Sequence, residues 1–193
     1  MTIFITKLNL KEIKAALVVA AASTLLACGQ PDSTAKNTAR SVSAEPSAAT
    51  TTPANHSELL KNVSATVYKD ANCSCCKDWI SYAEAQGLQS TAHDVADVGL
   101  FKDRYGVPDD MRSCHTAVTN DGFVFEGHVP AKFMAQFLAN PPANAIGLAV
   151  PNMPVGSPGM EYQNKFDPYQ VIQLNKDGST QVFATIEAPQ QQL

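Results

Sequence analysis

Residues 65–85 read ATVYKDANCSCCKDWISYAEA. The alternating stretch 65–68 predicts a β-strand, and the pattern over 76–86 predicts a helix that Gly87 closes. Three cysteines fall at the junction of these two elements: Cys73, Cys75 and Cys76. A thiol in the first turn of a helix faces unpaired backbone N–H groups and the positive end of the helix dipole, which favour its thiolate. We therefore expect a reactive, metal-binding site at the start of this helix.

The third cysteine makes this motif more than a redox dithiol. Cys73 and Cys76 have the Cys-x-x-Cys spacing of such a pair. Cys75 adjoins Cys76, cannot easily join the same disulfide, and so adds a soft metal ligand. The alternative is that these are buried structural cysteines. Because the chain has five cysteines and three of them lie in one turn, we favour a chemical role.

The rest of the chain predicts an α/β domain. Strands are expected over 64–69, 89–94, 114–119 and 123–126, and helices over 76–86, 98–105 and 130–139. This order, with a cysteine pair after the first strand, is that of a thioredoxin-like fold, a mixed sheet flanked by helices. A second β-hairpin, 169–174 with 181–186, is expected to extend the sheet edge or form an appendage. Residues 58–188 make up this domain, and 189–193 are expected to be a disordered tail.

The chain begins with a predicted lipoprotein signal peptide, residues 1–27. Basic residues precede an apolar run, 15–26, that is too short to span a bilayer, and the sequence Leu25-Leu26-Ala27-Cys28 resembles a lipobox. Lipidation of Cys28 would anchor the protein, and Gly29 after it favours the outer membrane, facing the periplasm. The alternative is an ordinary cleaved signal peptide.

Residues 28–57 predict a flexible tether rich in Ala, Ser, Thr and Pro, in which His56 is a solvated linker residue. The formal net charge of −4 gives no indication of nucleic-acid binding.

Further candidate ligands follow the cysteine motif. Cys114 and His115 open the third strand, whose entrance in thioredoxin-like folds lies against the active dithiol, so Cys114 is expected to face Cys73 and Cys76. His128 stands where the fourth strand gives way to a Pro-started helix. For His115 and His128 the choice between metal ligand and buried core histidine stays open, and His93 is interpreted as structural.

The loop 147–160 is rich in Pro and Gly, which argues against regular structure. Its two methionines, Met153 and Met160, carry thioethers that suit Cu(I), and Met111 is a further candidate.

Four motifs in order resemble the CopG-type family of periplasmic copper-resistance proteins. They are Cys73-x-Cys75-Cys76, Ser113-Cys114-His115-Thr116-Ala117, Glu126-Gly127-His128-Val129-Pro130 and Gly156-Ser157-Pro158-Gly159-Met160. The resemblance covers about residues 64–175 and implies a thioredoxin-like domain that binds copper through its cysteines. Ser74 and Asn152 depart from it, since the family usually has Gly at the first position and often at the second.

The sequence therefore predicts a membrane-tethered periplasmic copper-binding protein. Cys73, Cys75, Cys76 and Cys114 would bind Cu(I), either as a single ion or as a cluster. Interconversion of Cu(I) and Cu(II) at this site would be an oxidoreductase activity. Other periplasmic copper-resistance proteins are expected partners. One alternative is a thioredoxin-type thiol-disulfide oxidoreductase with Cys73 as nucleophile and Cys76 as resolving thiol. Another is a structural zinc module, which the spacing and the thioethers favour less.

Overall fold

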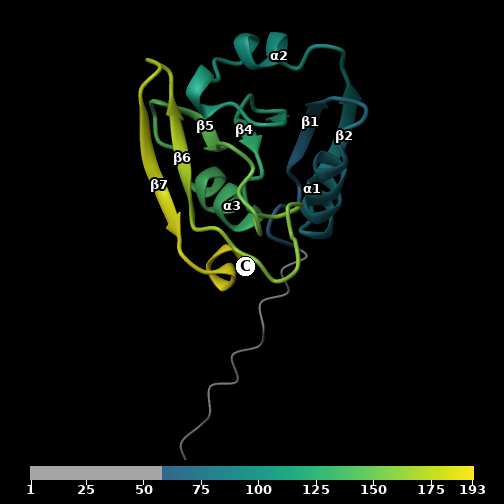
Figure 1. Ribbon diagram of the computed structural model, residues 1–193. Helices are drawn as coiled ribbons and strands as arrows, with labels where there is room; N and C mark the ends of the chain where they lie inside the picture. Colours follow the sequence, from purple (N-terminus) through teal and green to yellow (C-terminus); the bar gives the residue numbers. More distant parts are fainter. Residues whose placement is uncertain (1–57) are drawn as a thin grey trace, which may run out of the picture. The chain divides into compact units, whose positions relative to one another are not determined.

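The structure is a computed structural model that describes residues 58–193, and its centre is one seven-stranded sheet (Figure 1). The strands are β1 (Ser64–Lys69), β2 (Gln89–Asp94), β3 (His115–Thr119), β4 (Val124–Gly127), β5 (Ala145–Val150), β6 (Tyr169–Asn175) and β7 (Thr180–Ile186). The α-helices are α1 (Ser74–Ala85), α2 (Gly99–Arg104) and α3 (Ala131–Ala139), with short 3₁₀ helices η2 (Asp109–Met111) and η3 (Pro189–Gln192).

The sheet is mixed, with the strand order β2-β1-β3-β4-β5-β6-β7. β1 pairs with β2 and β4 with β5 in parallel, and the other neighbouring strands are antiparallel. The predicted α/β class is thus confirmed, and each predicted helix and strand lies within two residues of its observed bounds.

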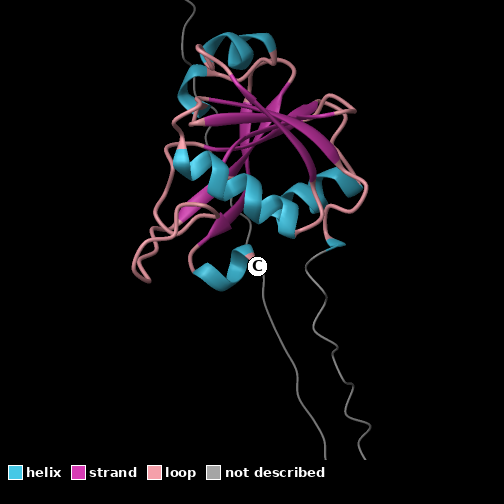
Figure 2. Ribbon diagram, turned by 90° about the vertical axis from the view of Figure 1, so that its right-hand side faces the viewer, coloured by secondary structure: helices cyan, strands magenta, loops and turns pink. Residues whose placement is uncertain are grey.

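The two faces of the sheet carry different helices. Successive strand side chains point to opposite faces, so Val67 of β1 joins the core under α1 and α3, whereas Tyr68 stacks on Phe101 of α2 at 4.1 Å between ring centroids. Figure 2 shows α2 on one side of the sheet and the longer helices on the other. The larger core therefore lies beneath α1 and α3, where Trp79 and Phe137 are completely buried.

The start of α1 is fixed by a cysteine. Cys73 is the N-cap residue, and its Sγ accepts a hydrogen bond from the Cys76 N–H at 3.3 Å. A capping side chain satisfies one of the N–H groups that the first turn leaves unpaired. The helix consequently begins at Ser74, two residues before the predicted start, and places all three cysteines of the motif at its N-terminus.

One strand was not predicted. The sequence interpretation assigned residues 147–160 to irregular structure, but 145–150 form β5, which lies between β4 and β6. This apolar run is covered on both faces, so it lacks the alternation that marks a half-buried strand. The irregular loop begins only at Pro151.

The C-terminus also departs from expectation. The second hairpin, β6 with β7, extends the sheet edge, one of the two predicted outcomes. Residues 189–193, predicted as a disordered tail, instead contain η3, and Gln192 is buried. The Gln192 side chain donates to the Gly156 carbonyl at 2.8 Å and accepts from the Tyr169 hydroxyl at 2.5 Å. These two bonds hold the chain end against the loop that follows β5.

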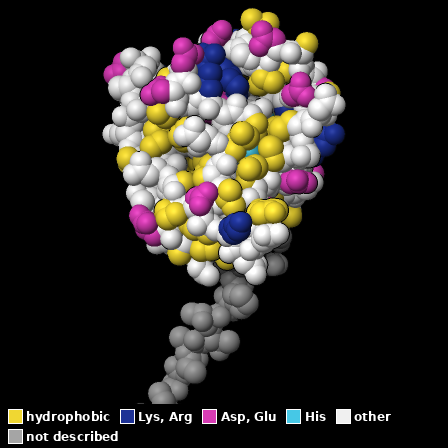
Figure 3. Space-filling view, in the orientation of Figure 1, with side chains coloured by type: hydrophobic (Ala, Val, Ile, Leu, Met, Phe, Trp, Pro, Cys, Tyr) yellow, Lys and Arg dark blue, Asp and Glu magenta, His cyan; other side chains and the backbone are white. Residues whose placement is uncertain are grey.

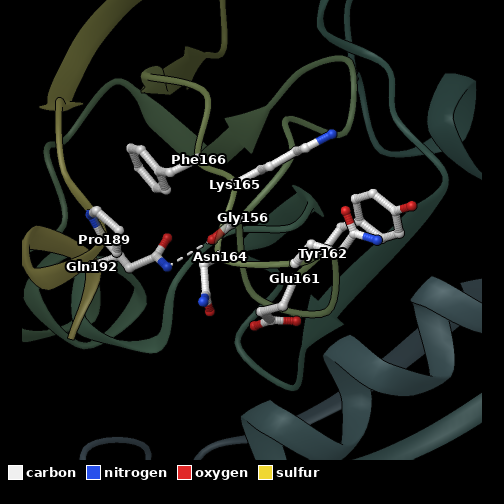
Figure 4. A pocket seen from close by; sticks show the side chains of 9 residues that line it. Gly156, Glu161, Tyr162, Asn164, Lys165, Phe166, Pro189 and Gln192 are labelled. Carbon is white, nitrogen blue, oxygen red and sulfur yellow. Dashed lines mark hydrogen bonds between the residues drawn. The ribbon is translucent and has the colours of Figure 1, made fainter.

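A pocket of about 410 Å³ opens beside this contact (Figure 4). Its walls include Glu161, Tyr162, Lys165 and Phe166, and Gln192 lies on one side with its bond to Gly156 drawn. None of the predicted metal ligands lines it.

The predictions for residues 1–57, including Cys28 and His56, fall outside the described part of the chain. Among residues 58–193, no helix combines the length and the apolar character that crossing a bilayer requires.

Replacing Gln192 by Ala should destabilise the protein by about 1–3 kcal/mol, because the buried Tyr169 hydroxyl and Gly156 carbonyl would lose their partner. Urea unfolding of the full chain measures this. Gln190→Ala, which removes the same kind of side chain from an exposed position of the same turn, is the control and should leave the midpoint unchanged. Equal midpoints for both variants would mean that η3 does not contribute to stability.

Candidate metal centre

Four cysteine sulfurs meet at the start of α1. The Sγ atoms of Cys73, Cys75, Cys76 and Cys114 all lie within 4.8 Å of one another. Cys73 and Cys76 form a disulfide, and Cys75 and Cys114 are free thiols. The Cys75 sulfur is 3.6 Å from that of Cys73 and 3.9 Å from that of Cys114. The distal cysteine thus faces the motif, as the sequence interpretation expected from the fold.

His128 directs one ring nitrogen at this group. Its Nδ1 lies 2.7 Å from the Pro158 carbonyl oxygen, which can only accept, so Nδ1 carries the proton. Burial is the main cause that lowers the His128 pKa, and the ring is therefore neutral at pH 7. Nε2 is then an unprotonated acceptor 3.0 Å from the Cys114 sulfur. This is the arrangement in which a carbonyl orients a histidine for metal binding.

His115 also approaches Cys114, although the strand alternation left room for it to point away. Its Nδ1 is 3.3 Å from the Cys114 sulfur, and its ring lies 4.5 Å from that of Trp79. The side chain is completely buried, and its Nε2 has no hydrogen-bond partner among the described residues. Burial lowers its pKa well below the usual value, with further contributions from His128, Lys102 and Lys69. Cys114, His115 and His128 form a second group of converging ligand atoms.

The Cys114 thiol is protonated in this metal-free state. Burial raises its pKa to about 12, and the neighbouring Cys75 adds to the shift. Its proton can be donated to His128 Nε2, which is unprotonated because Nδ1 of the same ring carries the proton. A soft metal ion that binds this sulfur must displace that proton.

The loop after β5 packs against the cysteines. Gly159 has φ +81°, and a Cβ there would lie 2.6 Å from the backbone nitrogen of Trp79 and 3.0 Å from the Cys75 carbonyl oxygen. The loop backbone therefore touches the first turn of α1, and the partly buried Met160 follows directly. Met153 lies earlier in the same loop and is 43% exposed.

The other candidates lie apart from the thiols. Met111 packs against the smaller core on the α2 side of the sheet, with Val107 and Leu174. His93 is exposed on β2 beside the ring of Tyr68. Figure 3 shows side chains of the hydrophobic class, which includes Cys, Met and Pro, gathered in the middle of one face, with acidic side chains around them.

The comparisons with known proteins agree on one family. The sequence profile of a family described as "Protein of unknown function, DUF411" matches residues 111–160. A solved structure titled "Copper resistance protein copG- Form 1" is 46% identical, with a TM-score of 0.61, over 65% of this chain and 98% of its own. The chain belongs to the CopG copper-resistance family.

A second solved structure, titled "Copper resistance protein copG- Form 2", gives the same result. It is 48% identical, with a TM-score of 0.59, over 64% of this chain and 97% of its own. No curated protein matches. The predicted resemblance is thereby confirmed, and with it a cysteine-rich centre suited to copper.

One departure from the family pattern has a structural counterpart. Asn152 has φ +72°, in the left-handed region that suits Gly and, next best, Asn. Asn can therefore replace Gly here without changing the course of the loop. Ser74 is the first residue of α1, where a helical backbone places no demand for Gly.

Sequence reasoning missed two polar residues beside the centre. Lys102 of α2 and Glu126 of β4 form an ion pair in which neither side chain is more than 6% exposed. Glu126 accepts a hydrogen bond from the Ser113 N–H at 2.6 Å, next to Cys114. The sequence indicated this pair only through the position of Glu126, directly after the apolar residues Phe123, Val124 and Phe125. An acidic residue in such a strand is seldom buried unless it is paired.

In fully reduced protein, Cu(I) affinity should increase with pH, because burial raises the pKa of the Cys114 thiol, so protons compete with the metal for its sulfur. This thiol alone should contribute about tenfold per pH unit. His128, whose pKa is lowered, is already neutral and adds no slope near pH 7. Titration against a competing chelator between about pH 6 and 9 measures the effect. Cys114→Ser should give a shallower dependence, and an unchanged slope in that variant would contradict the assignment.

Proposed function

We propose that this protein binds Cu(I) through Cys73, Cys75, Cys76 and Cys114 and that it serves copper tolerance in the periplasm. The observation that carries the proposal is the meeting of four cysteine sulfurs within 4.8 Å, two of them joined in a disulfide that reduction would open. Thiolates are soft ligands that prefer Cu(I) to hard divalent ions. The titles of the two solved relatives, both copper resistance proteins, support the same metal.

Several copper ions are expected, because thiolate sulfurs can bridge metals and four of them are present. Additional ligands would come from His128, whose Nε2 is unprotonated and faces Cys114, and from His115, whose buried Nε2 lacks a partner among the described residues. Met160 and Met153, on the loop that touches α1, are proposed as thioether ligands at the edge of the cluster.

Redox chemistry is proposed to accompany binding. Cys73 and Cys76 are close enough to form a disulfide, and the same sulfurs are proposed as ligands. When two thiolates form that disulfide they lose two electrons, which two Cu(II) ions can take up to become two Cu(I) ions. The reverse reaction uses two Cu(I) ions to reduce the disulfide. Metal loading and disulfide formation therefore compete for the same sulfurs.

The fold and location are proposed on the following grounds. The order β2-β1-β3-β4, with β1 parallel to β2 and antiparallel to β3, supports a thioredoxin-like core to which β5, β6 and β7 are added. The sequence of residues 1–28 supports export to the periplasm and a lipid anchor on Cys28 in the outer membrane. Other periplasmic copper-resistance proteins are the proposed partners.

The competing function is thiol-disulfide exchange on proteins, which the Cys73–Cys76 disulfide at a helix start favours. A simple exchanger needs only those two cysteines. Cys75 and Cys114 crowd its disulfide and would compete for the mixed disulfide with a substrate. The two functions therefore assign opposite roles to the extra thiols.

Four single Cys→Ser variants separate these functions. Reduced wild-type protein should bind more than one Cu(I), and Cys75→Ser or Cys114→Ser should lower the copper count and weaken affinity at least about 10–100-fold, since even supporting residues of metal sites have effects of that size. Anaerobic titration measures the copper, with zinc as competitor, and an insulin-reduction assay measures exchange.

The opposite pattern would reject copper binding at this cluster. If Cys114→Ser kept full copper loading while Cys73→Ser alone abolished a strong reductase activity, the exchanger would be correct. If zinc displaced Cu(I), the structural zinc module would replace both.

The lipid anchor has its own test. Cys28→Ala should release the protein from the membrane fraction and prevent labelling by a fatty-acid analogue, because its thiol and amino group are the proposed acylation sites. Copper binding should be unchanged, because about thirty flexible residues are expected between Cys28 and the domain. Ser33→Ala, a change of similar size in the same tether, is the control. Membrane association that persists in Cys28→Ala would exclude the lipobox.

A further inference from the structure

The carboxylate of Glu126 lies in the interior, on the face of the sheet that α2 covers. Its side chain is completely buried and accepts three hydrogen bonds. The donors are the Lys102 ammonium, the Thr116 hydroxyl at 2.7 Å and the Ser113 backbone N–H at 2.6 Å. Lys102, itself 5% exposed, also donates to the Thr116 hydroxyl at 3.1 Å. Both carboxylate oxygens of Glu126 and the Thr116 hydroxyl thus have partners, whereas the buried Oγ of Ser113 has none among the described residues.

Stability alone does not account for such a network. A buried ion pair loses so much hydration that replacing it with apolar side chains of similar size is often neutral or stabilising. The neighbours of Glu126 in β4 are apolar, and an apolar side chain there would continue the strand pattern. The network therefore calls for a role beyond packing, and its contact with Ser113 indicates one.

The Ser113 N–H belongs to the segment that carries the fourth thiol. Cys114 precedes β3, and the register of β3 begins at His115 opposite Lys69 and at Thr116 opposite Glu126. The sheet ladder thus does not hold the backbone at Ser113. The bond from its N–H to Glu126 supplies a fixed point one residue before the thiol.

The same segment is held from a second side. Gly127, with φ +69°, leaves space that Ser113 occupies, because a Cβ at Gly127 would lie 2.6 Å from both the Cβ and the Oγ of Ser113. Close contact at Gly127 and the hydrogen bond to Glu126 together determine where the backbone turns into β3. That turn sets the distance of Cys114 from Cys75 and His128.

We propose that Glu126 is a positioning residue for Cys114: its carboxylate, oriented by Lys102 and Thr116, fixes the Ser113 N–H and so holds the fourth sulfur in the cluster. The consequence for copper rests on the proposed function, whereas the placement of the thiol does not. Loss of the carboxylate oxygen should leave the fold in place and weaken the hold on one ligand.

Two double variants of the full chain isolate this effect. Both remove the ion pair, through Lys102→Met combined with either Glu126→Gln or Glu126→Leu. Gln keeps an oxygen for the Ser113 N–H and an amide to donate to Thr116, whereas Leu keeps neither. We expect Cu(I) affinity within about threefold of wild type for the Gln variant and about 10–100-fold weaker for the Leu variant. Urea unfolding shows that both are folded.

A second measurement does not depend on copper. In reduced, metal-free protein, peptide-resolved mass spectrometry gives the alkylation rate of Cys114 separately from the other thiols. The rate should increase in the Leu variant only, because its backbone segment is released. If wild type bound no copper, the proposed function would fail, while this comparison would still test the positioning role.

Three results would overturn the inference. The first is an equal copper affinity in the two double variants, whether that affinity equals the wild-type value or is weakened to the same extent in both. The second is an unchanged Cys114 alkylation rate in the Leu variant. If the Leu variant does not fold, amide hydrogen exchange of wild type decides: the Ser113 N–H should be protected, and exchange as fast as that of an exposed loop amide would show that the bond to Glu126 does not hold the segment.

Discussion

The alternation of side chains along β3 and β4 is the constraint on which the candidate metal centre depends. His115 points toward α1 and the ring of Trp79, whereas the next residue, Thr116, points toward α2 and bonds to Lys102. The sheet thereby places the histidine on the side of the sulfurs and the ion pair on the other side. Cys114 directly precedes β3, where it is contacted from both faces: His128 approaches its sulfur from one, and the bond from Ser113 to Glu126 fixes its backbone from the other.

Burial acts on the titratable groups of the centre in one direction. It raises the pKa of Cys114 and lowers the pKa values of His115 and His128, so each group is held in its uncharged form. A set of copper thiolates carries negative charge and would be opposed by the same surroundings. The ammonium groups of Lys69 and Lys102 lie nearby, but each is paired with a carboxylate, that of Asp94 or Glu126 respectively. The candidate ligands are therefore neutral in the metal-free state, and the nearby lysine charges are already balanced by their carboxylate partners.

Local patterns in the sequence predicted the elements and the thiols, and long-range contacts account for what was missed. The cysteine motif, the two hairpins and each half-buried strand follow from neighbours in sequence. β5 was missed because burial on both faces removes alternation, and the order of the tail depends on Gln192 meeting Tyr169 and Gly156. The role of Glu126 could not be predicted, because its partners come from two other parts of the chain, α2 and the segment that enters β3. Whether His115 faces Cys114 likewise depends on how the chain enters β3.

The loop after β5 shows how these distant contacts bear on the ligands. Asn152 and Met153 both have φ above +70°, a conformation that costs a residue with a side chain about 1–2 kcal/mol. Contacts on either side offset this cost: before the pair, Val150 is paired with Gly127 in the sheet, and after it, the Gly156 carbonyl accepts a hydrogen bond from Gln192. With both ends of the segment fixed, the exposed thioether of Met153 is presented at the surface by an ordered backbone. The C-terminal turn, remote from the cysteines in sequence, thus takes part in shaping the loop that carries Met153 and Met160.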